Sequence, residues 1–400
     1  MRARSSLFPI LCSLLLSSCA TTPVAAPAPD LSGSWYGTTQ DRGLPLSILL
    51  HVKRSADGQY SGTADSPNQV AFDLPIRKLG LEGEQFKAVI DKDGDDVTFA
   101  GTVDPAGQKI EGQLKLRDRS PGLVLQRTDP ATLNLPRPRS LFYDIDGHHI
   151  HYVQMDGPTD LRVVFVHGTP GSWDGWARYL GDADLQRHAT LIAVDRPGFG
   201  ESEGAVVPDM REQARLLAPL LRGPGPADPA IKPAAVRTIV VGHSLGGPIA
   251  GELAMDFPDQ VQGALLIAPS IDPATEGPRW YNQAMTWWAV SALVSRFMDP
   301  ELAAANQELM PLAGQLKTME PRWKQLPMPV TVIQGEKDDL VDPRTADFAQ
   351  RVLPQGSRII RVPDEGHFVL WEQPQIELQA LSGLFDTGAV AGMPTGSAAR

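Results

Sequence analysis

The chain has 400 residues but only two cysteines, and both lie among its first twenty residues. A protein body without cysteine excludes a disulfide framework, a cysteine-rich zinc site and a cysteine nucleophile. Basic residues are also few, since 36 Lys and Arg stand against 47 Asp and Glu, for a formal net charge of −11. Binding to phosphate backbones requires clustered positive charge, so we expect no nucleic-acid partner.

A hydrophobic run long enough to cross a bilayer is missing from the N-terminal region. The apolar run at residues 7–16 follows Arg2 and Arg4, and it is much shorter than the roughly 20 residues that a transmembrane helix needs. A short apolar run behind positive charges is typical of a signal peptide.

The end of this run, residues 16–19 (LSSC), resembles the lipobox of bacterial lipoproteins. In that family the peptide is cut before the cysteine, whose sulfur then carries a diacylglycerol. The resemblance implies a signal peptide over residues 1–18 and a lipid attached at Cys19. The Pro/Ala-rich composition that follows indicates an extended tether over residues 19–30. It places the protein in the bacterial cell envelope, at the outer membrane or the periplasmic face. An ordinary secretory signal with an incidental cysteine is the alternative.

Residues 31–128 alternate short apolar segments with turn signals, a pattern that favours an antiparallel all-β domain. A large apolar residue is followed two places on by glycine in several segments, as in Trp35 and Gly37, which suits strands that bend while a sheet closes. We therefore predict a small, lipocalin-like barrel, with a spacer or docking role favoured over ligand binding. Its strands are expected near residues 31–39, 45–54, 59–65, 70–80, 85–91, 96–103, 109–117 and 121–127.

A proline-rich linker, residues 129–140, separates this domain from a different pattern. Beyond it, apolar runs alternate with longer helical segments, which is typical of an α/β sheet. Continuous apolar runs suit parallel strands that are covered on both faces. These runs are residues 161–166, 190–194, 236–241, 264–267 and 330–333.

One of these runs leads directly into residues 242–247 (GHSLGG), which precede a helical segment at residues 248–257. This is a Gly-x-Ser-x-Gly sequence between a strand and a helix, the context of a nucleophile elbow. The glycines permit a sharp turn, which would present the Ser244 hydroxyl at the edge of the sheet beside a helix N-terminus.

With four further motifs in the family's chain order, residues 141–385 resemble the α/β-hydrolase superfamily. The resemblance implies a mostly parallel sheet with helices on both faces, a catalytic domain over residues 141–386 and a helical cap at about residues 268–326. Residues 387–400 are expected to be a disordered tail. The further motifs are residues 167–171 (HGTPG), which resemble the oxyanion loop, residues 195–202 (DRPGFGES), the acid loop at residues 335–341 (GEKDDLV) and residues 366–368 (GHF).

The resemblance also implies a role for each motif residue. Serine at its ordinary pKa is a weak nucleophile, so Ser244 would need His367 to accept its proton. Asp338 would orient the imidazole ring, with the neighbouring Asp339 and Asp342 as alternative acids. The backbone N–H groups of Leu245 and Thr169 would stabilise the oxyanion. No metal site and no cofactor are predicted.

The predicted function is that of a serine hydrolase, a carboxylesterase that acts on small apolar esters. The expected cap and the segment after the oxyanion loop are rich in aromatic and methionine side chains, which favours an apolar pocket. An aminopeptidase or amidase, another serine-dependent α/β hydrolase, and an inactive binding lipoprotein are the alternatives. The side chains in question are Trp173, Trp176, Trp280, Tyr281, Met285, Trp287, Trp288, Phe297, Met298, Met310, Met319 and Trp323.

Overall fold

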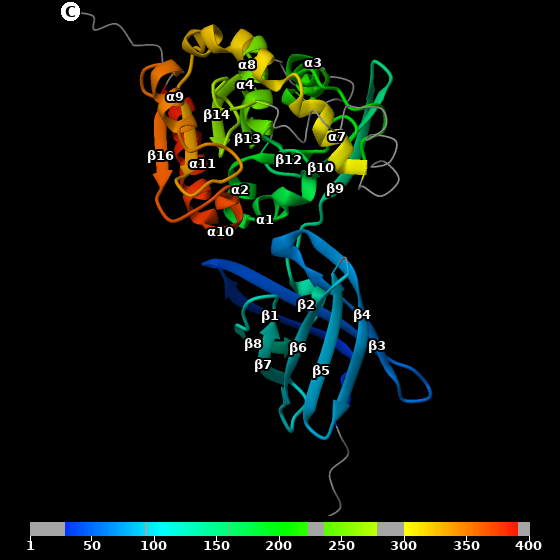
Figure 1. Ribbon diagram of the computed structural model, residues 1–400. Helices are drawn as coiled ribbons and strands as arrows, with labels where there is room; N and C mark the ends of the chain where they lie inside the picture. Colours follow the sequence, from blue (N-terminus) through cyan, green and yellow to red (C-terminus); the bar gives the residue numbers. More distant parts are fainter. Residues whose placement is uncertain (1–28, 93, 159, 223–235, 278–299, 391–400) are drawn as a thin grey trace, which may run out of the picture.

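The computed structural model describes residues 29–92, 94–158, 160–222, 236–277 and 300–390. The expected signal peptide, Cys19 and part of the expected cap lie outside the described residues. The described chain folds into a β barrel, coloured blue to cyan in Figure 1, and an α/β domain, coloured green to red. No helix in these ranges is long and apolar enough to cross a membrane.

The N-terminal domain is an eight-stranded closed barrel, as predicted, because β1 pairs with β8 as well as with β2. All neighbouring strands are antiparallel. Each of the eight predicted strands is present, with its ends shifted by a few residues at most. The strands are β1 (Gly33–Asp41), β2 (Leu44–Arg54), β3 (Tyr60–Ser66), β4 (Ala71–Glu82), β5 (Gln85–Lys92), β6 (Asp95–Val103), β7 (Lys109–Lys115) and β8 (Gly122–Arg127).

The pairing of large apolar residues with glycine has a clear structural reason. Trp35 and Phe99 are fully buried inside the barrel, whereas the glycines lie against the backbone of the neighbouring strand. A Cβ atom on Gly112 would come within 2.0 Å of the Ala100 carbonyl oxygen, and one on Gly37 within 2.1 Å of the Val124 carbonyl oxygen. Only glycine permits strands to approach so closely.

The second domain is built on an eight-stranded sheet in the order β16-β15-β14-β13-β11-β12-β10-β9. β10 runs antiparallel to β9 and β12, and the other neighbouring strands are parallel. The five predicted apolar runs form β11 to β15, and residues 141–155 contribute most of a hairpin. The strands are β9 (Arg139–Ile145), β10 (His148–Met155), β11 (Leu161–Val166), β12 (Thr190–Val194), β13 (Arg237–His243), β14 (Val261–Ile267), β15 (Val330–Gly335) and β16 (Arg358–Val362).

Helices cover both faces of this sheet, as expected, and a separate apolar cluster fills the space on each face. The last helix runs to Val390, so it extends past residue 386, where the sequence places the end of the domain. The helices are α1 (Ala177–Leu180), α2 (Ala183–His188), α3 (Met210–Leu217), α4 (Gly246–Asp256), α7 (Pro300–Leu309), α8 (Leu312–Met319), α9 (Thr345–Val352), α10 (Val369–Glu372) and α11 (Pro374–Val390).

The described part of the expected cap contains α7, α8 and a 3₁₀ turn at Glu320–Gln325. Met319 and Trp323 belong to the core rather than to a pocket: they are 1% and 0% exposed and pack against Gly251 of α4. The prediction of pocket-lining side chains is therefore wrong for these two. Trp280, Trp287 and Trp288 lie outside the described residues.

The barrel packs against the α/β domain through the end of β1 and the 3₁₀ turn Pro67–Gln69. Asp41, at the end of β1, accepts a hydrogen bond from Arg178 of α1 at 2.7 Å. Val70, which follows the turn, is buried in an apolar cluster of the α/β domain together with Leu180. Figure 1 shows α1 and α10 on the side of the domain that faces the barrel.

Glu377 of α11 is a buried carboxyl group that makes stability depend on pH. Its side chain is 1% exposed, and burial raises its pKa to about 8. Because the unfolded chain releases this proton near the ordinary value of 4.5, the stabilising contribution of the protonated form is complete below that pH. It is lost as the pH rises toward about 8.

We expect the Glu377→Gln variant to be more stable than the wild type at about pH 8 and to differ little at about pH 5, because the amide cannot ionise. Melting temperatures of both proteins across this range measure the difference. Parallel pH curves would contradict the assignment.

Candidate active site

Ser244 occupies the tight turn between β13 and α4 and has a positive φ of 53°. This left-handed conformation is strained for a residue with a side chain. The flanking glycines are required by space: a Cβ atom on Gly242 would lie 2.1 Å from the Gly246 carbonyl oxygen, and one on Gly246 would lie 2.3 Å from the Val166 carbonyl oxygen. The turn therefore has the geometry that the sequence predicts for a nucleophile elbow.

His367 and Asp338, predicted from separate motifs, form a buried pair. The Nδ1 atom of His367 lies 2.8 Å from Oδ2 of Asp338, and each residue is 6% exposed. A ring that donates from Nδ1 to a carboxylate keeps Nε2 as its proton acceptor in the neutral state. The alternative acids are placed differently, since Asp339 is exposed and Asp342 forms an ion pair with Arg344.

The carboxylate of Asp338 is held by more than the histidine. Its Oδ1 atom accepts hydrogen bonds from the backbone N–H groups of Leu340 and Val341, both at 2.9 Å, and Oδ2 also accepts one from Gln334 at 3.1 Å. Burial raises the pKa of Asp338, but the hydrogen bond with His367 and the two backbone donors outweigh it, so the pKa lies below its ordinary value. The acid is therefore ionised when it faces the imidazole ring.

A cavity of about 520 Å³ brings the predicted site residues together. Ser244, His367 and Thr169 line it, while Asp338 is not among the lining residues. Leu245 is buried at the start of α4, with its side chain in the core. The Ser244 hydroxyl makes no hydrogen bond to another described residue, and such a contact often forms only when substrate is bound.

The rim of this cavity contains three apolar side chains, two of which belong to the predicted acid and histidine motifs. Leu340, Phe368 and Trp371 line the cavity and are 52%, 47% and 40% exposed. The rings of Phe368 and Trp371 are stacked, with centroids 5.1 Å apart. Trp176 of the predicted aromatic group also lines the cavity. Phe368 follows the predicted histidine directly, but nothing in the sequence indicates that Trp371 lies beside it.

His243, next to the elbow, supports the backbone of the histidine loop. Its Nε2 atom lies 3.0 Å from the carbonyl oxygen of His367. Burial, together with the nearby His367, lowers the pKa of His243 to about 3. The ring is therefore neutral and donates a hydrogen bond to that carbonyl. His243 therefore has a structural role at the histidine loop.

The histidines of the β9–β10 hairpin have partners of their own. His149 pairs with Asp144 at 2.7 Å, and His151 pairs with Asp195 at the same distance. Within the described ranges, no group of three or more His, Cys, Asp or Glu side chains could hold a metal ion.

The fold, the elbow and the histidine–carboxylate pair agree with a match to known proteins. Residues 163–379 match the sequence model of the alpha/beta hydrolase family. The match covers more than half of the chain, so the protein belongs to the alpha/beta hydrolase family.

Individual proteins match this chain at low sequence identity or over only part of their length. Lipase 3 of a Moraxella species is 25% identical over 257 residues, which are 56% of this chain and 78% of the lipase. A dihydrolipoyllysine-residue acetyltransferase component of the acetoin cleaving system, from Cupriavidus necator, is 33% identical over 129 residues; the chain spans 31% of its length. The structure of Cfl2 from Burkholderia cenocepacia has a TM-score of 0.50 and 21% identity, and covers 62% of this chain and 96% of its own. This likeness shows the shared fold.

Proposed function

We propose that the protein is a serine hydrolase, a carboxylesterase that cleaves apolar esters through an acyl-enzyme. The observation that carries this proposal is the strained turn of Ser244, which shares one cavity with His367, itself bonded to the ionised Asp338. The Ser244 oxygen would attack the ester carbonyl while Nε2 of His367 accepts its proton. The imidazolium would then protonate the leaving alcohol, and a water molecule activated by the same nitrogen would release the acid.

The tetrahedral intermediate needs hydrogen-bond donors for its negative oxygen. The backbone N–H groups of Leu245 and Thr169 are the candidates, and neither donates a hydrogen bond to another described residue. Leu245 also begins α4, whose N-terminus favours negative charge. Loss of one such donor typically lowers kcat by about 100- to 1000-fold.

The apolar rim supports a preference for apolar esters over charged substrates. An acyl or alcohol group that contacts Leu340, Phe368 and Trp371 would bury surface that these side chains otherwise expose to water. The relation to a protein named Lipase 3 is consistent with an ester as the substrate. Amide hydrolysis is the second candidate, since the same nucleophile and base serve both reactions.

The experiment that tests the proposal combines labelling with a substrate panel. A fluorophosphonate probe should label the wild-type protein, and peptide mass spectrometry should locate the label on Ser244. Among p-nitrophenyl esters of rising chain length and Pro- and Leu-anilides, the esters should be cleaved much faster. Absence of labelling would overturn the serine hydrolase assignment, and faster cleavage of the anilides would overturn the esterase assignment.

The lipoprotein signal leads to a second proposal, that the protein is attached to the bacterial envelope by a lipid on Cys19. In cells that process lipoproteins, the Cys19→Ala variant should lack the acyl mass increment and leave the membrane fraction. Equal membrane retention of both proteins would contradict the anchor.

A further inference from the structure

Two hydrogen bonds to its carbonyl oxygen fix the orientation of the peptide group between Gly168 and Thr169. Its carbonyl oxygen accepts a hydrogen bond from Nδ1 of His167 and another from Nη2 of Arg196, both at 2.7 Å. In a planar trans peptide, the carbonyl oxygen and the following N–H point in opposite directions. The two donors on Gly168 therefore also fix the direction of the Thr169 N–H, and Thr169 lines the cavity that holds Ser244.

Both of these hydrogen bonds depend on Arg196. Its backbone N–H donates to Nε2 of His167 at 3.0 Å, which leaves Nδ1 as the protonated nitrogen that faces the Gly168 carbonyl oxygen. Burial, followed by the charge of Arg196, lowers the pKa of His167 well below its ordinary value, so this neutral tautomer persists. Arg196 thus sets one donor through its backbone and supplies the other through its guanidinium.

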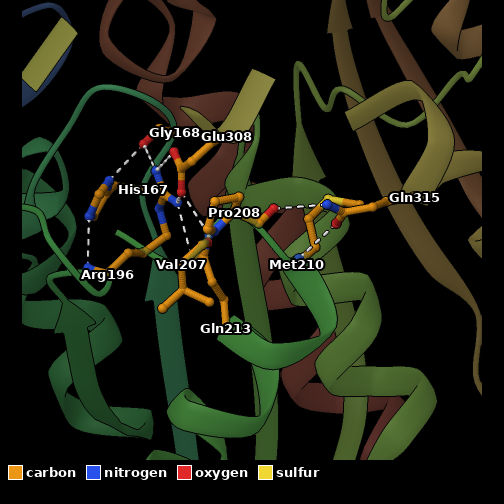
Figure 2. A network of polar contacts seen from close by, with 9 residues as sticks. All are labelled: His167, Gly168, Arg196, Val207, Pro208, Met210, Gln213, Glu308 and Gln315. Atoms are coloured by element: carbon orange, nitrogen blue, oxygen red, sulfur yellow. Dashed lines mark hydrogen bonds and ion pairs between the residues drawn. The ribbon is translucent and has the colours of Figure 1, made fainter. Parts of the chain in front are cut away.

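The guanidinium is itself positioned by the cap. Arg196 is 0% exposed, and its charge is balanced by Glu308 of α7, which accepts hydrogen bonds from both Nη1 and Nη2. Gln213 of α3 joins the pair: its Oε1 accepts from Arg196 at 3.0 Å and its Nε2 donates to Glu308 at 2.7 Å. The ring of Phe199 lies 4.6 Å from the guanidinium carbon. Figure 2 shows this network reaching from the cap helix to Gly168.

A second polar contact ties the cap to the same region without reaching the loop. Gln315 of α8 accepts a hydrogen bond from the backbone N–H of Met210 at 2.8 Å and donates one to the Pro208 carbonyl at 2.9 Å. Figure 2 shows it beside the first network. Gln315 therefore offers a matched control, because it secures the cap but makes no bond to residues 167–169.

We propose that Arg196 and Glu308 are positioning residues that couple the docking of α7 to the orientation of the Thr169 N–H. This inference rests on the proposed function, in which that N–H stabilises the oxyanion. The core supplies the nucleophile, and α7, which lies about 140 residues after Thr169 in the chain, holds the oxyanion donor in place. Displacement of α7 would free the guanidinium and loosen the loop, so hydrolysis would be efficient only with the cap in place.

The test is the double variant Arg196→Met with Glu308→Met, because removal of one partner alone would leave a buried, unpaired charge. We expect kcat for the best ester to fall by about 10- to 100-fold with KM little changed, since the donor is misaligned rather than lost. The inhibition constant of a trifluoromethyl ketone, which forms an oxyanion on the enzyme, should rise by a similar factor. Arg196→Lys, which keeps the charge but not the planar fork, should show the same split if the double variant fails to fold.

Gln315→Leu is the control and should keep both kcat and the inhibition constant near the wild-type values. If the double variant kept the wild-type kcat and the wild-type affinity for the ketone, this inference would be overturned while the proposed function would stand. An equal loss in Gln315→Leu would also overturn it, because the integrity of the cap would then explain the effect. A wild-type protein that is neither labelled by the fluorophosphonate nor active on any ester would overturn the proposed function and this inference with it.

Discussion

Replacing Ser244 with alanine is expected to lower kcat for ester hydrolysis by about 10⁶-fold, the scale seen when the nucleophile of a serine hydrolase is removed. The reason is that the proposed acyl-enzyme could not form, while the cavity, the proposed oxyanion donors and the pair of His367 and Asp338 remain. Initial-rate kinetics on the best p-nitrophenyl ester measures the loss. The affinity for a non-cleavable ester analogue should change little, because the serine contributes only its oxygen atom.

Ser172 provides the matched control, because it also lines the cavity but bonds Asp174 instead of adjoining the elbow. The Ser172→Ala variant should keep kcat within about threefold of the wild type, because its hydroxyl takes no part in the proposed reaction. If Ser244→Ala retained more than a few percent of activity, or if Ser172→Ala lost as much, the nucleophile would be misassigned.

Asp338→Asn is expected to lower kcat by about 10⁴-fold, as the loss of the carboxylate does in a Ser-His-Asp protease. An amide nitrogen in place of Oδ2 would donate a hydrogen bond to Nδ1 of His367, so the ring proton would sit on Nε2. A protonated Nε2 cannot accept the proton of the Ser244 hydroxyl. The backbone donors of Leu340 and Val341 would keep the side chain in place. The same kinetic assay on the variant checks this.

A variant of the neighbouring Asp339 is the control that distinguishes loss of a nearby negative charge from loss of the group that orients the His367 ring. Its side chain is exposed, so Asp339→Asn should reduce kcat by no more than about threefold, given the screening of surface charges. Similar losses in the two variants would contradict the role of Asp338. A full loss in Asp339→Asn alone would assign the acid to that residue.

The elements that could be predicted are those whose cause is local. The turn at Ser244 needs glycine on both sides, and the six consecutive residues 242–247 (GHSLGG) show this requirement directly in the sequence. The β11 to β15 runs are apolar because both faces are covered, and the barrel strands carry turn signals between them. The pairing of His367 with Asp338 could be predicted only because the motifs stand in a known order.

The remaining features depend on contacts between distant segments. Glu308 lies 112 residues from Arg196, and nothing in its helix distinguishes it from a solvated acid. Trp323 and Trp371 look alike in the sequence, yet one is buried in the core and the other borders the cavity. Which aromatic ring faces a pocket is decided by how α7, α8 and α10 pack, and no local pattern records that packing.

The direction of β1 determines how far the site can stand from a membrane. Its Asp41 end is bound to α1 of the α/β domain, so its Gly33 end lies at the opposite end of the barrel. Nine strand residues cover about 25–30 Å, and the described chain enters the barrel at that remote end. With a lipid on Cys19, as proposed, the length of the barrel would lie between Ser244 and Pro29, the first described residue after the attachment point.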